Sequence, residues 1–168
     1  MKLALLSDLH ANLPALEACL AHARAQGATD FAVLGDIVGY GPQPSEVVDY
    51  CRELQRQGAT LLRGNHDVLP VNPVLTGSTW GDMTAAWTFR HLDDLQREWL
   101  AQLPLTATLG NVYLVHATAD APEKWHYVLD ERMAERSLDA ATKNPDVRYV
   151  FGGHVHQQSL YYRGSGQH

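Results

Sequence analysis

Short apolar runs alternate with amphipathic stretches through the first 62 residues of the chain. Three of the apolar runs have the length of buried strands: Lys2–Ser7, Phe31–Leu34 and Ala59–Leu62. The two stretches between them carry apolar residues at helical spacing, and they end in glycine, at Gly27 and Gly58. This β-α-β-α-β order predicts a parallel sheet with helical crossovers.

The pattern in the rest of the chain mixes helices with a second set of strands. Helical spacing predicts three helices: Asp82–Arg90, a segment with the apolar stripe Leu92, Leu95, Trp99 and Leu103, and Glu131–Ala141. Apolar runs predict a hairpin, a later strand and the start of one more: Thr106–Leu109 with Val112–Val115, Val147–Phe151, and Ser159–Tyr162. The loop Val68–Gly81 is expected to form a lid or a substrate wall.

The composition is typical of a soluble globular domain. The chain has 168 residues with no repeats or linkers, so we expect one domain over residues 1–168. No apolar stretch approaches the roughly 20 residues of a membrane helix, and the N-terminus lacks a signal-peptide pattern. Two widely spaced cysteines, Cys19 and Cys51, fit buried helix faces in a reducing cytoplasm.

Side chains that bind metals follow five of the predicted strands. They are Asp8 with His10, Asp36, Asn65 with His66, His116, and His154 with His156. Taken singly, each is better explained as a turn residue, a helix cap, or an ordinary core or surface histidine. Chance explains poorly why every predicted parallel strand ends in such a residue. In open α/β sheets, ligands bind beyond the carboxyl ends of the strands, so we expect one common site.

The chemistry of these side chains indicates a pair of cations. Carboxylate, imidazole and amide oxygen are ligands of divalent transition metals. Even without His66, the seven remaining side chains are too many for one ion but suit two ions about 3.5–4 Å apart that share a carboxylate, for which Asp36 is the candidate. In Asp8-x-His10 and His154-x-His156 the ligands lie two residues apart, so in an extended chain they would point the same way.

Taken in order, these residues resemble the five sequence blocks of the calcineurin-like metallophosphoesterase superfamily. The blocks are Asp8-x-His10, Gly35-Asp36, Gly64-Asn65-His66-Asp67, His116 and Gly153-His154-x-His156, and they cover nearly the whole chain. The segment Gly35–Pro42 resembles the small bacterial and archaeal phosphodiesterase branch. The resemblance implies a mixed α/β (α+β) fold, a four-layer α-β-β-α sandwich of two mixed sheets flanked by helices.

The resemblance also implies a role for each residue. It implies that one cation is held by Asp8, His10, Asp36 and His156, and the other by Asp36, Asn65, His116 and His154. His66 is then expected to contact the phosphate and assist the leaving group, and Asp67 to orient the His66 ring.

Two departures from the family pattern stand out. Ala117 follows His116 where the family usually has glycine. Family members also commonly continue past the last histidine pair with further strands. We therefore expect either a short variant or a piece of a longer domain, incomplete at its C-terminal edge.

These observations predict a cytoplasmic, dinuclear metal-dependent phosphoesterase. By resemblance, a metal-bridging hydroxide attacks the phosphorus of a small phosphodiester, or of a phosphomonoester, in line. Mn, Fe, Zn, Ni and Mg all suit this ligand set. A different class of function is a catalytically weak, metal-binding scaffold for other proteins. A nuclease is disfavoured because the net charge is −6, and no membrane partner is expected. A homo-oligomer is compatible with the sequence.

Overall fold

The first sheet contains three parallel strands joined by two helices. The computed structural model of the chain describes residues 2–69, 71 and 78–164. Its first strands are β1 (Leu3–Leu6), β2 (Asp30–Val33) and β3 (Thr60–Leu61), in the order β1-β2-β3. They are joined by α1 (Leu13–Ala25) and α2 (Pro44–Arg56). Helix α1 begins at a cap in which the Asn12 side chain accepts from the Ala15 amide at 3.1 Å.

The second sheet mixes strand directions. Strands β4 (Thr106–Leu109) and β5 (Val112–Val115) form the predicted antiparallel hairpin, and Gly110 in its turn has a φ of +59°. Strand β6 (Tyr149–Phe151) lies parallel to β5 on its other side. The prediction of two sheets flanked by helices is confirmed, although only this second sheet is mixed among the described strands.

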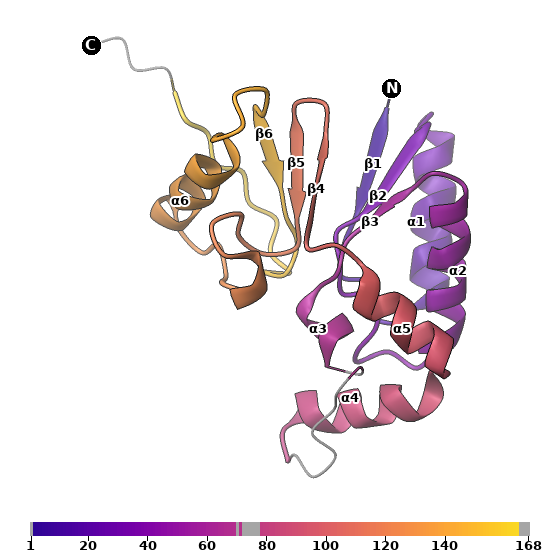
Figure 1. The fold of residues 1–168 in the computed structure, drawn as a ribbon. Coiled ribbons are helices and arrows are strands. Elements are labelled where there is room, and N and C mark those ends of the chain that lie inside the picture. The colour runs from indigo at the N-terminus through magenta and orange to yellow at the C-terminus, as the bar shows by residue number, and fades with distance from the viewer. Residues whose placement is uncertain (1, 70, 72–77, 165–168) are drawn as a thin grey trace.

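The molecule has four layers, with helices outside each sheet (Figure 1). Alternate residues of each strand of the first sheet face different layers, as the twofold period of a strand requires. In β1, Ala4 and Leu6 pack toward α1 and α2, whereas Leu3 and Leu5 pack toward the second sheet. The core between the sheets is built around four buried residues: Ala32, Leu34, Leu62 and Leu114. Burial on both faces explains why these strands are continuous apolar runs.

The remaining helices extend the outer layers. They are α3 (Asn65–Val68), α4 (Trp80–His91), α5 (Asp94–Gln102), the 3₁₀ turn η1 (Pro122–Lys124) and α6 (Glu131–Ala141). Helix α6 covers the outer side of the second sheet, while α5 lies near α2 and α3 (Figure 1). Among the described residues, no helix combines the length and the apolar character needed to cross a membrane.

Three of the four residues of the predicted α5 stripe lie in the core. Leu92 and Leu103 are buried, and Trp99 packs against the same cluster. Leu95 is the exception at 64% exposed, and the helix also buries Leu100 and Gln96. Leu92 lies before the helix, because Asp93 caps it by accepting from the Gln96 amide at 2.8 Å.

Three other predictions differ, wholly or in part, from the structure. No strand forms over Ser159–Tyr162, where the chain is irregular and Leu160 and Tyr162 are largely exposed, so it has no neighbour in either sheet. Cys51 is buried as predicted, but Cys19 is exposed on α1. Of the predicted loop Val68–Gly81, residues 70 and 72–77 lie outside the described residues, and α4 already begins at Trp80.

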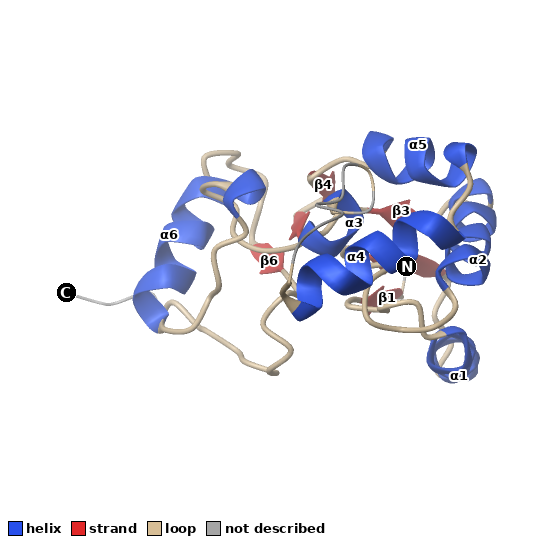
Figure 2. Ribbon diagram, turned by 90° about the horizontal axis from the view of Figure 1, so that it is seen from below, coloured by secondary structure: helices blue, strands red, loops and turns tan. Residues whose placement is uncertain are grey.

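Five of the six strands end at the same side of the molecule. Strands β1, β2 and β3 are mutually parallel, β5 and β6 are parallel, and only β4 runs the other way. Their carboxyl ends lie at the lower edge of the sandwich in Figure 1, and Figure 2 views the molecule from that edge. Segments that are far apart in sequence therefore meet there.

Candidate metal centre

The strand ends bring the predicted ligands together in two groups. One group contains four side chains, Asp8, His10, Asp36 and His156, and the other contains Asp36, His116 and His154. Within each group, one nitrogen or oxygen atom of every residue lies within 4.8 Å of the others. Asp36 belongs to both groups. The structure thus places one buried carboxylate between two clusters of possible ligands.

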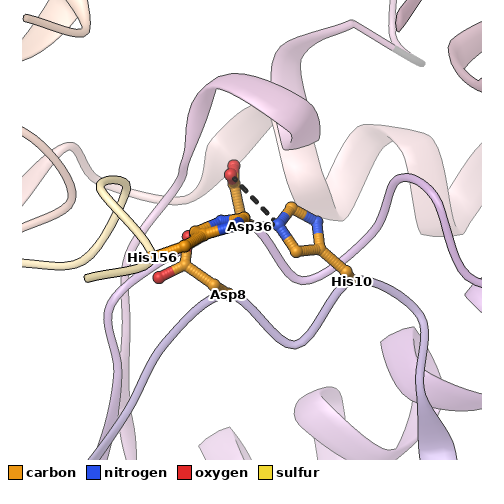
Figure 3. Close-up of side chains that lie close together, drawn as sticks. All are labelled: Asp8, His10, Asp36 and His156. Atoms are coloured by element: carbon orange, nitrogen blue, oxygen red, sulfur yellow. Dashed lines mark hydrogen bonds and ion pairs between the residues drawn. The ribbon is translucent and has the colours of Figure 1, made fainter. Parts of the chain in front are cut away.

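The first group has the spacing expected of ligands around one cation (Figure 3). His156 Nε2 lies 3.1 Å from Asp8 Oδ1 and 3.1 Å from His10 Nε2. His10 Nε2 lies 3.8 Å from Asp36 Oδ2. Ligand atoms about 2.1 Å from one ion, at angles between 90° and the tetrahedral value, are about 3.0–3.4 Å apart. The donor atoms therefore fit a divalent cation with little adjustment.

The second group is more deeply buried. His116 Nε2 lies 3.4 Å from Asp36 Oδ2 and 3.2 Å from Asn65 Oδ1. His116 and Asp36 are 0% and 1% exposed, and His154 is also buried. Asn65, the first residue of α3, thus brings its amide oxygen to this group, as the sequence led us to expect. The second group also fits a cation with mixed nitrogen and oxygen ligands.

Backbone carbonyl groups hold three of the imidazole rings in place. His10 Nδ1 lies 3.2 Å from the Val38 carbonyl oxygen, and His116 Nδ1 lies 2.8 Å from that of Leu34. His154 differs, because its Nε2 lies 2.8 Å from the carbonyl oxygen of Trp125. A nitrogen that donates to a carbonyl leaves the other nitrogen with a free lone pair. His10 and His116 thus present Nε2 to the centre, and His154 presents Nδ1.

The backbone at the strand ends is left-handed rather than extended. Five of the predicted ligands have positive φ angles: Asp8 (56°), His10 (46°), Asp36 (54°), His154 (70°) and His156 (55°). Each such residue costs about 1–2 kcal/mol relative to ordinary backbone, and such strain is concentrated at functional sites. The spacing argument for an extended Asp8-x-His10 was therefore wrong in its geometry, although both pairs do converge.

Two glycines allow the strand ends to approach one another. A Cβ at Gly64 would overlap Oδ1 of Asp36, and one at Gly153 would overlap both Ser7 and the Asp8 carboxylate. The amide next to Gly153, that of His154, donates to Asp8 Oδ2 at 3.1 Å. Only glycine permits this contact between the ends of β1 and β6.

Comparison with known proteins agrees with this geometry. The sequence profile of the calcineurin-like phosphoesterases matches residues 1–158. The chain belongs to the calcineurin-like phosphoesterase family. It is 31% identical, over 160 residues, to an uncharacterized protein of Methanocaldococcus jannaschii, covering 92% of this chain and 62% of that protein.

Solved structures give the same fold. A metallophosphoesterase of Sphaerobacter thermophilus superposes with a TM-score of 0.75 at 34% identity, covering 93% of this chain and 61% of that one. A hypothetical protein of Pyrococcus horikoshii has a TM-score of 0.71 at 21% identity, covering 84% of this chain and 65% of that one, which shows the fold alone. This calcineurin-like phosphoesterase chain thus spans about six-tenths of the length of the first two relatives.

The charges at the candidate metal centre favour an ionised carboxylate. Burial acts to raise the pKa of Asp36, but the hydrogen bond and charge of His116 and the amide of His66 outweigh it, so the pKa lies below its usual value. Burial acts to lower the pKa of His116, and Asp36 overcomes this and raises it. A metal ligand must be an ionised carboxylate, which is the state that Asp36 adopts here.

The pKa values of two further imidazoles lie below their usual value. Burial lowers the pKa of His66, despite the nearby charge of Asp36. Burial and the neighbouring His116 lower the pKa of His154. A lowered pKa favours the neutral imidazole, whose free nitrogen lone pair a metal ligand such as His154 requires.

Asp67 is bonded differently from what the sequence led us to expect. Its Oδ1 accepts from the amides of Ile37 and Val38 at 2.8 and 3.1 Å, and its Oδ2 accepts from the amide of Gly64 at 2.8 Å. The residue is completely buried. Its carboxylate therefore ties the loop after β2 to the loop after β3, and both of its oxygens are engaged away from the His66 ring.

Three aromatic residues at the site were not assigned by the sequence analysis. The ring of Tyr40 lies 4.5 Å from that of His66 and 4.8 Å from that of His10, measured between centroids. Tyr127 stacks on His154 at 4.2 Å, and Trp125 supplies the carbonyl described above. Tyr40 lies between Gly39 and Gly41 in the sequence, and these two glycines were the local signal that could have pointed to it. No feature of the neighbouring sequence indicates that the carbonyl of Trp125 contacts His154.

Other histidines and one nearby arginine lie outside the centre. His22 and His126 are exposed, and the exposed His91 bonds to the Trp87 carbonyl at 2.8 Å. The Arg63 guanidinium donates to the carbonyl of Ala101 near the end of α5, at 2.6 Å.

Proposed function

We propose that this protein is a dinuclear metal-dependent phosphoesterase that hydrolyses a phosphodiester. The observation that carries the proposal is the shared position of Asp36, whose carboxylate belongs to both ligand groups. Asp8, His10, Asp36 and His156 would hold one divalent cation, and Asp36, Asn65, His116 and His154 the other. Such a pair, when bound, binds phosphoryl oxygens, acidifies water and offsets negative charge in the transition state.

The residues around the centre supply the rest of the reaction. Water attacks phosphorus in line, the bond from phosphorus to the leaving oxygen breaks, and the water loses its proton. The leaving oxygen takes a proton from His66, the candidate donor. The proton lost by the water passes to solvent, from which His66 is protonated again. The His66 amide donates to Asp36 Oδ1 at 2.8 Å, so the backbone that carries its side chain is fixed relative to the centre. No covalent intermediate is required.

An open cleft beside the first ligand group has room for a small substrate. Its volume is about 680 Å³, and its walls include Asp8, His10, His156 and Tyr40. Leu9 and Leu16 add apolar surface to the same lining. This combination suits an ester with a phosphate at the cations and an organic group in the cleft.

The partners and the metals follow from the same argument. The substrate class is a small phosphate ester, diester rather than phosphoprotein, and the acidic net charge of −6 disfavours nucleic acid. Mn, Fe, Zn, Ni and Mg all suit the ligand set. We place the protein in the cytoplasm.

The test combines metal content with hydrolysis. Protein loaded with Mn²⁺ and desalted should contain about two ions per chain and hydrolyse bis(4-nitrophenyl) phosphate. Asp36→Asn should lose both ions and reduce kcat at least about 100-fold, because it removes the shared ligand. Asp8→Asn should lose mainly one ion. Asp49→Asn, on the exposed side of α2, is the matched control and should change neither.

Two results would overturn the proposal. A wild-type protein that binds at most one ion would contradict the dinuclear centre. A protein that binds two ions but turns over no phosphoester, in a screen of diesters and monoesters, would instead support the protein-interaction scaffold.

A further inference from the structure

The His66 ring has no hydrogen-bond partner among the residues that the structure describes, although its role requires a defined direction. Asp67, the adjacent carboxylate, is fully used by three backbone amides. The His66 amide is fixed by Asp36 at 2.8 Å, but this bond leaves the side-chain torsions free. Something other than a hydrogen bond must hold the imidazole.

The ring of Tyr40 occupies the place where such a support is needed. Its centroid lies 4.5 Å from that of His66, with 50° between the ring planes. It also lies 4.8 Å from His10, edge to face, and His10 in turn lies 5.2 Å from His66 with an interplanar angle of 89°. Aromatic rings at these separations attract one another with a preferred geometry. The three rings form a packed triangle.

The backbone that carries Tyr40 is itself fixed against the same two histidines. Tyr40 has a φ of 62° and Gly39 a φ of 91°. A Cβ at Gly39 would lie 2.8 Å from His66 Nδ1, and one at Gly41 would overlap the carbonyl oxygen of His10. The segment Gly39-Tyr40-Gly41 therefore fits closely around His10 and His66, and the left-handed turn directs the tyrosine ring between them.

We propose that Tyr40 is the positioning residue of His66, holding its imidazole toward the leaving oxygen. This inference rests on the proposed function, because it concerns the step in which His66 protonates the leaving group. It gives a role to the Gly-Tyr-Gly segment that the ligand geometry alone does not require. The phenol oxygen is not needed for this role, whereas the ring is.

The alternative role for Tyr40 is that of a substrate wall. Tyr40 is 56% exposed and borders the 680 Å³ cleft. A wall would bind the organic group of the ester and affect KM, whatever the leaving group. A positioning residue would affect kcat, and most strongly where the leaving group depends on protonation. The two roles therefore predict different kinetics.

The kinetic test uses two diesters that differ in the leaving group. With methyl phenyl phosphate, whose phenolate leaves poorly, Tyr40→Ala should lower kcat about 30-fold or more. With methyl 4-nitrophenyl phosphate, the loss should be about 3-fold or less, and KM should change little for either. Tyr40→Phe should retain wild-type kinetics. Tyr149→Ala, an equally exposed tyrosine on β6, is the control and should change nothing.

A double variant tests whether the effect passes through His66. Tyr40→Ala combined with His66→Ala should be no slower than His66→Ala alone, because a support has no effect once the supported ring is gone. Additive losses, or a rise in KM that is equal for both esters, would overturn the positioning role and favour a substrate wall.

A spectroscopic measurement tests the same idea without turnover. In NMR spectra of the protein, the His66 ring should occupy one rotamer in the wild type and in Tyr40→Phe, and should average between rotamers in Tyr40→Ala. A single rotamer in all three would overturn the proposal even if the esters are cleaved. Absence of turnover in the wild type, with the expected NMR result, would reject the proposed function and leave the role of Tyr40 intact.

Discussion

The His116 ring joins the two sheets through its hydrogen bond to Leu34, whose carbonyl oxygen lies 2.8 Å from His116 Nδ1. His116 follows β5 of the second sheet and Leu34 follows β2 of the first. The opposite nitrogen of the same ring faces Asp36 and Asn65. One imidazole thus serves both the contact between the sheets and the candidate metal centre.

Replacing His116 by alanine should therefore reduce stability as well as metal binding. It removes a fully buried side chain and leaves the Leu34 carbonyl without its partner, which should cost about 3 kcal/mol of unfolding free energy. Urea unfolding should be measured in EDTA, so that lost metal binding does not contribute. His22→Ala, on the exposed face of α1, is the control and should change stability by less than about 0.5 kcal/mol. Equal stability of His116→Ala and wild type would show that the bond between the sheets contributes little.

The position of Gly64 against Asp36 should make this glycine irreplaceable. In Gly64→Ala, the added methyl group overlaps the Asp36 carboxylate and must displace it or the backbone. We expect a loss of about 1–3 kcal/mol and loss of the shared metal ligand. Gly81→Ala is the matched control, because it lies within α4 and its Cβ would meet nothing closer than 3.8 Å. It should be neutral or stabilise by up to about 1 kcal/mol. Thermal unfolding and Mn²⁺ content provide the readout, and normal metal content in Gly64→Ala would contradict the expectation.

Replacing Asp67 by asparagine separates a structural from a catalytic role. The amide group cannot accept from all three backbone amides, so one buried N–H would face an NH₂ group and the unfolding free energy should fall by about 1–3 kcal/mol. Asp49→Asn, which has an exposed ion pair on α2, should fall by less than about 0.5 kcal/mol. If Asp67 instead orients the His66 ring, kcat would fall while stability in urea stayed at the wild-type value.

Chelation should destabilise the loaded protein. Bound ions stabilise the folded state by mass action, by about 2.7 kcal/mol for one site at a free concentration of 100 Kd. The Tm of the wild type should fall when EDTA is added and recover with excess Mn²⁺. Asp36→Asn should show neither change. An identical response of this variant would place the stabilising ion elsewhere.

The sequence predicted those parts of the fold that depend on local patterns. The apolar runs of β1, β2 and β5 mark strands that are buried on one or both faces, and the structure contains them. Helix α2 buries Val47, Val48, Cys51 and Leu54, as its spacing indicates. Three residues of the α5 stripe lie in the core, and only Leu95 is exposed. The pattern alone does not reveal that Asp93 caps the helix after Leu92.

The candidate centre was predictable for a different reason. Parallel strands all deliver their carboxyl ends to one edge, so side chains that follow them meet whatever the details of packing. The carbonyl of Trp125, the left-handed backbone of the ligands and the direction of the Asp67 carboxylate depend on contacts between distant segments. Residue identity does not encode such contacts locally, and they emerge only once both sheets are assembled.

The amide of His154 reaches the Asp8 carboxylate across 146 residues of sequence. The candidate ligands extend from Asp8 to His156, just beyond that interval, so no early portion of a growing polypeptide can assemble them. The last histidine pair must be synthesised before either ion has a complete set of donors. Once bound, the ions would link the two sheets late in folding and oppose their separation.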